Sequence, residues 1–435
     1  MDNRQRQTGQ KRDVTYYVLP SQKRFRDSTA RFKGFSGPVG SGKSLALCHE
    51  AVHLTYINAG RTGLIGAPTY PMLRDVIQAA FFSILDENDV PYRFNKTTNT
   101  VRMPDIGSTV LFRSLDHYER LRGTNLAWFG IDEMTYCAEQ AWTRLEARLR
   151  DPKAERLCGF GAWTPKGFDW VHRRFKGEPV AGYELIEAQP FENRHLLEQV
   201  PDYYDRLKAS YDERFFEQEV MGKYLSLTSG QVYYAFDRRH NTGTFTFDPQ
   251  RPLIWSWDFN LNPMCSVLCQ ERGEEVVVLG EIVIETSSTP EVCDEFFKRY
   301  GSQRATIEVY GDASGGHKHT SSAKSDYQII REFFHQHPEL RSTVNPTKAN
   351  PPVRDRVNAV NSRLCNALGD RRLLIDRRCT ELIKDLEQVS YKAETSQIDK
   401  EKDHRRTHLS DALGYYLWRR FRPLAQAGEQ SRRLM

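Results

Sequence analysis

Four residues near the start of the chain have the types and the spacing of a phosphate-binding loop. They are Gly37, Gly42, Lys43 and Ser44, in the pattern G-x-x-x-x-G-K-[ST]. Glycines let backbone N–H groups turn inward around phosphate oxygens, and a helix that follows directs its positive N-terminal end at them. We expect Lys43 to reach the β- and γ-phosphates of a nucleoside triphosphate and the Ser44 hydroxyl to ligate Mg²⁺. The predicted nucleotide site comprises Gly37, Gly40, Ser41, Gly42, Lys43 and Ser44, with Asp132 and Gln22 from other segments.

The elements expected around this loop fit that chemistry. An apolar-alternating run at 32–36 predicts a strand before the loop, and the spacing at 44–56 predicts a helix after it. Strand, glycine loop and helix is the order that phosphate binding requires. Gln22 lies upstream and can bond both edges of an adenine through its amide, although the start of a surface helix explains this residue as well. The alternative for the loop, a Gly-rich turn with an exposed lysine, leaves the later acidic motifs unexplained.

Two acids follow an apolar run at 126–131. A buried strand that ends in acids places them at the carboxyl edge of an open α/β sheet, where such sheets bind ligands. We predict that Asp132 holds Mg²⁺ through its water shell and that Glu133 orients and deprotonates the attacking water. Apolar runs ending in Asp-Glu are common, but this one follows a phosphate loop in an α/β pattern. Thr164 directly follows another expected strand and could sense the γ-phosphate, although an ordinary turn after the strand explains this residue as well.

Three aspartates in the second half stand at the ends of expected elements. Asp258 ends one strand, Asp312 ends another, and Asp411 lies in the first turn of a helix. Each has a structural explanation, as a turn former, a cap or a helix-dipole partner. Converging at one edge, they could hold two divalent ions about 4 Å apart, which would stabilise the attacking and leaving oxygens of phosphodiester cleavage. Glu281 or Glu285, on a neighbouring strand, could assist.

Size and composition are those of a soluble protein with two domains and connectors. The chain has 435 residues, 39% hydrophobic and 27% charged, with a net charge of +5 that does not by itself argue for nucleic acid. The chain also contains clusters of basic residues, which in most proteins form solvated faces and less often contact phosphate. They lie at 4–12, 371–378, 400–406 and 419–422.

The cysteines and the apolar runs indicate a cytoplasmic protein. The 8 cysteines contain no C-x-x-C pair and no metal-finger spacing, so reduced thiols are the simplest account. No apolar run approaches the roughly 20 residues of a membrane span. We therefore expect neither secretion nor membrane insertion.

Changes in pattern divide the chain into five parts. We expect a flexible arm at 1–14, an α/β domain at 15–195, a lid and linker at 196–249, a second domain at 250–422 and a tail at 423–435. A helical stretch over 201–225 opens the linker. The second domain begins with three closely spaced β-rich runs, which predict an antiparallel meander.

Taken in order, these motifs resemble those of the large terminase subunits of tailed bacteriophages. The resemblance rests on the segments GPVGSGKS, LRGTNLAWFGIDE, WTPKG, WDFN, GDASG and HLSDALGY, and it extends from about residue 16 to residue 421. It implies an α/β protein with an N-terminal P-loop ATPase domain of the RecA-like, additional-strand type, built on a mostly parallel sheet. It also implies a C-terminal RNase H-like nuclease domain with a mixed sheet.

The resemblance also assigns roles to individual residues. Arg122, ten residues ahead of Asp132, matches a position thought to reach a neighbouring subunit's γ-phosphate. Many family members have an arginine inside the phosphate loop, whereas Pro38-Val39-Gly40 supplies none here. Arg122, or Arg120 beside it, is therefore the better candidate to stabilise transition-state charge. The remaining assignments are Lys43, Ser44, Asp132 and Glu133 as ATPase residues, Thr164 as the coupling motif, and Asp258, Asp312 and Asp411 as metal ligands.

The implied activity is an ATP-driven motor that translocates double-stranded viral DNA into a procapsid. A metal-dependent endonuclease would cut concatemeric DNA at the initiation and termination of packaging. The implied cofactors are ATP, Mg²⁺ in the ATPase site, and two Mg²⁺ or Mn²⁺ in the nuclease site. The implied partners are double-stranded DNA, a portal protein, a small terminase subunit and further copies in a homo-oligomeric ring, expected to be a pentamer, with no membrane. We expect the protein in the host cytoplasm, docked transiently on the procapsid.

Two other functions remain open from the sequence. One is a cellular ATPase-nuclease of DNA repair or transposition, which virion genes beside this one would argue against. The other is a DNA-binding assembly factor whose catalytic sites have decayed. The second is weakened because the phosphate loop and both acidic sets are intact.

Overall fold

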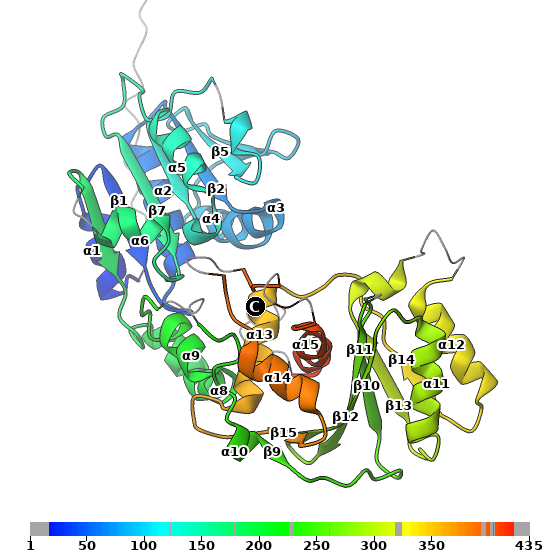
Figure 1. Ribbon diagram of the computed structural model, residues 1–435. Coiled ribbons are helices and arrows are strands. Elements are labelled where there is room, and N and C mark those ends of the chain that lie inside the picture. Colours follow the sequence, from blue (N-terminus) through cyan, green and yellow to red (C-terminus); the bar gives the residue numbers. More distant parts are fainter. Residues whose placement is uncertain are drawn as a thin grey trace, which may run out of the picture. The chain divides into compact units, whose positions relative to one another are not determined.

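The computed structural model describes residues 17–121, 123–177, 180–225, 230–260, 262–317, 324–392, 397–400, 403 and 405–421. The predicted arm at 1–14 and tail at 423–435 lie outside these residues. The chain forms two compact units (Figure 1). The first comprises the chain up to Pro201 together with Glu217–Ser226, and the second comprises Asp202–Phe216 and the chain from Leu227 onward.

The first unit is built on an eight-stranded sheet in the order β3-β4-β5-β2-β6-β7-β1-β8. Strands β2, β5, β6, β7, β1 and β8 pair in parallel, while β3 and β4 are antiparallel at one edge. This mostly parallel sheet confirms the predicted architecture of the N-terminal domain. The strands are β1 Phe32–Ser36, β2 Thr62–Ala67, β3 Arg93–Asn95, β4 Thr100–Met103, β5 Ser108–Ser114, β6 Trp128–Ile131, β7 Cys158–Trp163 and β8 Tyr183–Glu187.

Apolar side chains cover both faces of this sheet. Every residue of β1 is buried, as expected for a parallel strand covered on both sides. Phe35 joins a cluster that includes Leu47 of α2, whereas Phe32 joins a second cluster with Trp142 of α5. The alternation along β1 therefore places α2 and α5 on opposite faces. The helices of this unit are α1 Pro20–Asp27, α2 Lys43–Ile57, α3 Tyr70–Met72, α4 Ala79–Glu87, α5 Glu139–Glu146, α6 Trp170–His172 and α7 Arg194–Gln199.

The second unit is built on a seven-stranded mixed sheet in the order β14-β13-β10-β11-β12-β15-β9. Strands β10, β11 and β12 form an antiparallel meander, as predicted, and the other pairs are parallel. Ile254 of β10 packs into one cluster and Trp255 into another, so this sheet is also covered on both faces. The strands are β9 Thr242–Gly243, β10 Leu253–Asp258, β11 Met264–Arg272, β12 Glu275–Ile284, β13 Ile307–Gly311, β14 Ser342–Val344 and β15 Leu373–Asp376.

The helices of the second unit include most of the segment predicted as one helical stretch over 201–225, whose residues from Glu217 onward belong to the first unit. That stretch is instead two helices, α8 Tyr203–Ser210 and α9 Glu213–Glu219. They separate because Tyr211 is extended and the Asp212 carboxylate accepts a hydrogen bond from the Phe215 N–H at 2.9 Å, as a helix N-cap does. The others are α10 Arg238–Asn241, α11 Thr289–Tyr300, α12 Asp326–Gln336, α13 Val353–Leu364, α14 Thr380–Gln388 and α15 His408–Arg420.

No helix within the described ranges combines the length and the apolar composition that crossing a bilayer requires.

Candidate active sites

The phosphate loop joins the carboxyl end of β1 to the start of α2. Gly40 and Gly42 adopt left-handed φ angles of 78° and 74°, which glycine tolerates best. A Cβ atom on Gly42 would also lie 2.6 Å from Nε2 of Gln22. The φ angle of Gly42 therefore favours glycine, and a larger residue would also have to push the end of the Gln22 side chain aside.

The side chains of the loop bond to the backbone of the loop and to Asp132. Lys43 is buried, and its Nζ donates to the Pro38 carbonyl oxygen at 3.0 Å. The Ser41 hydroxyl donates to the same oxygen at 2.8 Å. The Ser44 hydroxyl lies 3.1 Å from each carboxylate oxygen of Asp132. A helix start and a distant strand end thus place a hydroxyl and a carboxylate side by side, the pair that sequence reasoning assigned to Mg²⁺.

Asp132 and Glu133 follow β6 at the carboxyl edge of the sheet. The Asp132 N–H donates to Gly66 of β2 at 2.9 Å, which fixes its backbone. Burial and the neighbouring charge of Glu133 raise the pKa of Asp132 to about 7, although the Ser44 hydrogen bond and Lys43 oppose the shift. Glu133 has a left-handed φ of 47°, which is uncommon for a non-glycine residue. Strain of this kind concentrates at functional sites.

Thr164 lies between the loop and the acids. It directly follows β7, whose last residue, Trp163, accepts a hydrogen bond from the Gly37 N–H at 3.0 Å. The Thr164 carbonyl oxygen accepts from the Thr135 hydroxyl at 3.4 Å, in the turn after Glu133. The backbone around Thr164 thus contacts both motifs.

Gln22 packs against the phosphate loop. Its Nε2 donates to the Gly42 carbonyl oxygen at 3.1 Å, and its Oε1 accepts from the Leu19 N–H at 3.0 Å. In this arrangement both ends of the amide bond backbone groups of the protein.

Sequence reasoning missed a second segment that supports the loop. Asn193 Nδ2 donates to the Gly40 carbonyl oxygen at 2.7 Å across 153 positions of sequence. Glu192 accepts from the Ser21 N–H at 2.6 Å. Asn193 was recognisable as the cap of α7, but nothing local could show which loop it reaches.

Arg122, the predicted trans-acting arginine, lies outside the described residues, as does the side chain of Arg120.

The three aspartates of the second unit meet at one edge of its sheet. Strands β10 and β13 are parallel neighbours, with Trp257 beside Gly311. The next residues, Asp258 and Asp312, therefore lie side by side at the carboxyl ends of these two strands. Helix α15 brings Asp411, because the Ser256 hydroxyl of β10 donates to the Ala412 carbonyl oxygen at 2.6 Å. All three carboxylates are buried, with exposures of 5%, 6% and 2% in sequence order.

The three carboxylates interact electrostatically. Burial raises the pKa of Asp258, as do the charges of Asp411 and Asp312, whereas a hydrogen bond to His408 lowers it. His408 Nδ1 lies 2.9 Å from Asp258 Oδ2. Asn260 Nδ2 contacts both of these groups.

The other two carboxylates are bonded to protein groups as well. Asp312 accepts from the Ser314 hydroxyl at 2.6 Å and from the Phe259 N–H at 3.3 Å. Asp411 Oδ1 lies 2.6 Å from Arg356 Nη2, and its Oδ2 lies 3.2 Å from Lys400 Nζ. The partners His408, Asn260, Arg356 and Lys400 were not assigned from the sequence.

The donor set fits hard divalent cations, which prefer carboxylate oxygens. In the part of the chain that the structure describes, however, no three His, Cys, Asp or Glu side chains are drawn together closely enough to hold a metal ion. Asp411 is instead paired with two cationic side chains. Binding of a metal by all three acids would therefore require a local rearrangement of these side chains.

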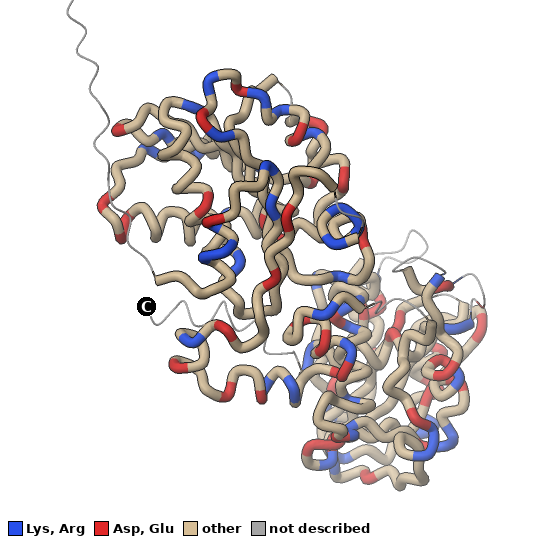
Figure 2. The backbone as a smooth tube through the Cα atoms, turned by 90° about the vertical axis from the view of Figure 1, so that its left-hand side faces the viewer, with Lys and Arg blue, Asp and Glu red and all other residues tan. Residues whose placement is uncertain are grey.

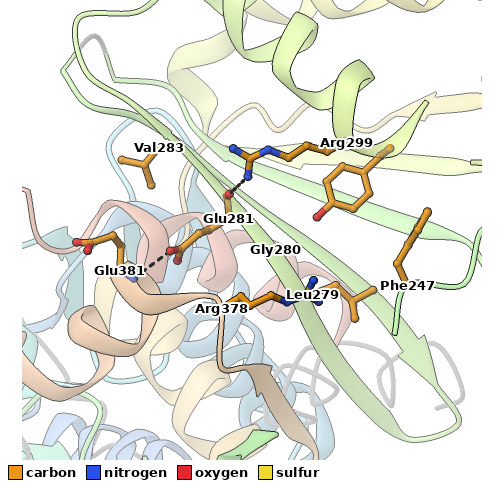
Figure 3. Close-up of a pocket in the computed structure, with 9 residues that line it drawn as sticks. Phe247, Leu279, Gly280, Glu281, Val283, Arg299, Arg378 and Glu381 are labelled. Atoms are coloured by element: carbon orange, nitrogen blue, oxygen red, sulfur yellow. Dashed lines mark hydrogen bonds between the residues drawn. The ribbon is translucent and has the colours of Figure 1, made fainter. Parts of the chain in front are cut away.

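Glu281 and Glu285, considered as assistants to this site, have other partners. Glu281 accepts a hydrogen bond from the Glu381 N–H at 3.0 Å (Figure 3) and another from the Leu382 N–H at 2.8 Å, so it anchors the start of α14. Glu285 lies 3.2 Å from Arg405. A polar cavity of about 570 Å³ adjoins Glu281, and its lining includes Arg299 and Arg378.

A mostly parallel sheet with a phosphate loop, followed by a mixed sheet with three carboxylates at one edge, defines a P-loop ATPase fold joined to an RNase H-like fold. The family model described as terminase large subunit, T4likevirus-type, N-terminal, matches residues 35–239. The model described as terminase RNaseH-like domain matches residues 255–419. Together the two models account for most of the chain, and the protein belongs to the terminase large-subunit family. This confirms the resemblance drawn from the motifs.

Solved structures of the large terminase from a thermophilic bacteriophage have the same fold. One crystal form is 14% identical with a TM-score of 0.66, covering 93% of this chain and 99% of that one. The complex of the same phage terminase with ADP is 16% identical with a TM-score of 0.65, covering 92% and 98%. Its complex with ATP-gamma-S is 15% identical with a TM-score of 0.64 and the same coverage. No curated protein sequence matches the chain.

Proposed function

We propose that the first unit hydrolyses ATP to drive packaging of double-stranded viral DNA. The observation that supports this most strongly is the contact of the Ser44 hydroxyl with Asp132 at 3.1 Å, across 88 positions of sequence. Mg²⁺ held by these two residues would supply Lewis-acid polarisation of the γ-phosphate. Lys43 would exchange the Pro38 carbonyl for phosphate oxygens. Glu133, on its turn beside Asp132, would orient the attacking water and accept its proton.

Hydrolysis would be transmitted through Thr164 and the segment that follows α9. Within the first unit the Val39 N–H of the phosphate loop donates to the Glu219 carbonyl oxygen at 2.7 Å. The Tyr224 hydroxyl donates to the Ser36 hydroxyl at 2.9 Å. Movement of the loop would therefore displace this segment, which supports our assignment of 196–249 as a lid and linker between an ATPase domain at 15–195 and a nuclease domain at 250–422.

We propose that the second unit cuts concatemeric DNA. Asp258, Asp312 and Asp411 would hold two Mg²⁺ or Mn²⁺, which would supply activation of the attacking water and stabilisation of the leaving oxygen. Before metal binding, His408 and Asn260 keep Asp258 oriented through the hydrogen bonds described above. The burial of all three acids at one sheet edge supports this role.

DNA would be gripped through its phosphates, because a packaging motor must accept any sequence. Lys and Arg are interspersed with Asp and Glu along the backbone of both units (Figure 2). We also propose a portal protein, a small terminase subunit and a homo-oligomeric ring, expected to be a pentamer, as partners on the procapsid in the host cytoplasm. Arg122 of one copy would act at the nucleotide of the next, so an isolated monomer should hydrolyse ATP slowly.

Two variants with matched controls test both activities. Lys43→Ala should abolish ATP turnover, while Lys23→Ala, on the exposed side of α1, should leave it unchanged. Asp312→Ala should abolish plasmid cutting with Mn²⁺ or Mg²⁺, while Asp294→Ala, exposed on α11, should not. Normal ATP turnover in Lys43→Ala, or normal cutting in Asp312→Ala, would contradict the corresponding assignment and favour a decayed assembly factor or a different site.

A further inference from the structure

Arg356 is a buried arginine that reaches the third acid of the nuclease site. It lies on α13, is 5% exposed, and its Nη2 contacts Asp411 Oδ1 at 2.6 Å. Its guanidinium lies 4.7 Å from the ring centroid of Tyr415. A Cβ atom at Gly414 would lie 2.5 Å from Arg356 Cγ, so the glycine leaves room for the arginine to cross α15.

The two cations at Asp411 differ in how firmly they are placed. The Arg356 side chain is 6% exposed, whereas that of Lys400 is 58% exposed. The Arg356 guanidinium is buried and packs on the ring of Tyr415, and its side chain passes over Gly414, so it cannot readily move away from Asp411. Its charge-assisted hydrogen bond is also stronger than one between neutral groups. Lys400, in contrast, can exchange its contact for water. Arg356 is therefore the more firmly placed of the two cationic partners of Asp411.

This contact addresses a problem of like charges. Three buried carboxylates at one sheet edge repel one another, and an unpaired buried charge is strongly destabilising. A bound metal would relieve this repulsion, but the acids must stay together before the metal arrives. Arg356 leaves lone pairs on both Asp411 oxygens, because one N–H bond occupies only one of about four acceptor positions.

We propose that Arg356 is a positioning residue of the nuclease site, a built-in counter-cation that holds Asp411 at the sheet edge until divalent ions bind. This inference rests on the proposed metal-dependent nuclease function. It predicts that Arg356 and the metal stabilise the same carboxylate, so loss of one raises dependence on the other.

Thermal unfolding of the full chain, in EDTA and in saturating Mn²⁺, tests this. In EDTA, Arg356→Met should lower the Tm by roughly 10 °C, the scale expected for one orphaned buried charge in a unit of this size. Mn²⁺ should recover at least half of that loss, a larger shift than in the wild type. Arg356→Lys, which keeps the charge, should lower the Tm less and show the wild-type shift.

Arg363→Met is the matched control, because Arg363 lies on the same helix but places its guanidinium over Phe421 and bonds the Glu274 carbonyl oxygen. Its Mn²⁺ shift should equal that of the wild type. The double variant Arg356→Met/Asp411→Asn should be more stable in EDTA than Arg356→Met alone, even if the single variant fails to fold.

Three results separate the possibilities. If the changes in Tm of Arg356→Met and of Asp411→Asn, each measured alone in EDTA, add up to the change in the double variant, the pairing is overturned. Equal Mn²⁺ shifts of the Tm in Arg356→Met and Arg363→Met would overturn the role of Arg356 as a stand-in for metal. If the wild type shows no Mn²⁺ shift, or if Asp258→Asn shows the same shift as the wild type, the metal site itself fails and this inference falls with it.

Discussion

A buried ion pair links the strand before the phosphate loop to the helix after it, and breaking this pair should be strongly destabilising. Lys33 of β1 lies 2.8 Å from Glu50 of α2, and both side chains are 0% exposed. Lys33 Nζ also donates to the carbonyl oxygens of Phe25 at 2.6 Å and Ser28 at 3.4 Å. The pair therefore ties the strand before the loop to the helix after it.

Replacing Lys33 with Met leaves Glu50 buried without its cation. Removing one partner of a buried pair typically costs about 3–5 kcal/mol, and the two carbonyls lose a donor as well. Replacing both partners, in Lys33→Met/Glu50→Leu, removes the orphaned charge, so we expect the double variant to recover to within about 1–2 kcal/mol of the wild type. Urea unfolding of the full chain, followed by tryptophan fluorescence, measures both values.

The cost should also depend on pH. Burial raises the pKa of Glu50 to about 6, and Lys33 opposes that shift. A raised pKa means that stability is present below the unfolded value and is lost as pH rises through the folded value. Without Lys33 the folded pKa rises further, so the difference between wild type and Lys33→Met should grow above pH 6. A loss below about 1 kcal/mol at pH 8, or a double variant no better than the single one, would refute this reasoning.

Three further predictions follow from the structure. Gly42→Ala should lose most nucleotide affinity and about 1–2 kcal/mol of stability, because it places a Cβ atom at a φ of 74° against Gln22. Calorimetric titration with ATP measures the affinity, and urea unfolding measures the stability. Normal affinity would contradict the loop geometry. Burial raises the pKa of Asp212 to about 7 from 3.8, so stability is lost as pH rises between about 4 and 7, by roughly 4 kcal/mol at most. Asp212→Asn should lose this pH dependence of stability, and identical pH profiles of wild type and variant would show that Asp212 is not its source. DNA affinity should fall by orders of magnitude between 50 and 200 mM salt if several phosphates are contacted; a flat response in filter binding would rule out the phosphate grip.

Much of both candidate sites could be predicted from the sequence, because the expected chemistry depends on short local patterns. Gly42, Lys43 and Ser44 follow one strand after a short loop, and Asp132 directly follows another, so the parallel order of strands in such sheets brings them to one edge. Asp258 and Asp312 likewise end strands, and β10 and β13 proved to be parallel neighbours.

The supporting residues could not be predicted because their partners are chosen by topology. Lys33 is one polar residue among apolar ones in β1, and the strand pattern does not indicate that Glu50 of α2 is its buried partner. Asn193 reaches Gly40, and Arg356 reaches Asp411, only because distant helices pack at particular positions. The break at Asp212 was missed for a different reason, since a cap inside an otherwise helical pattern is easily read as part of the helix.

The most direct test of the central claim is anomalous diffraction from crystals of the chain grown with an ATP analogue and Mn²⁺. We expect one manganese peak beside Ser44 and Asp132, and further peaks among Asp258, Asp312 and Asp411. Nucleotide without manganese at the three aspartates, or manganese bound elsewhere in the second unit, would contradict the view that one chain combines a packaging ATPase with a metal-dependent nuclease.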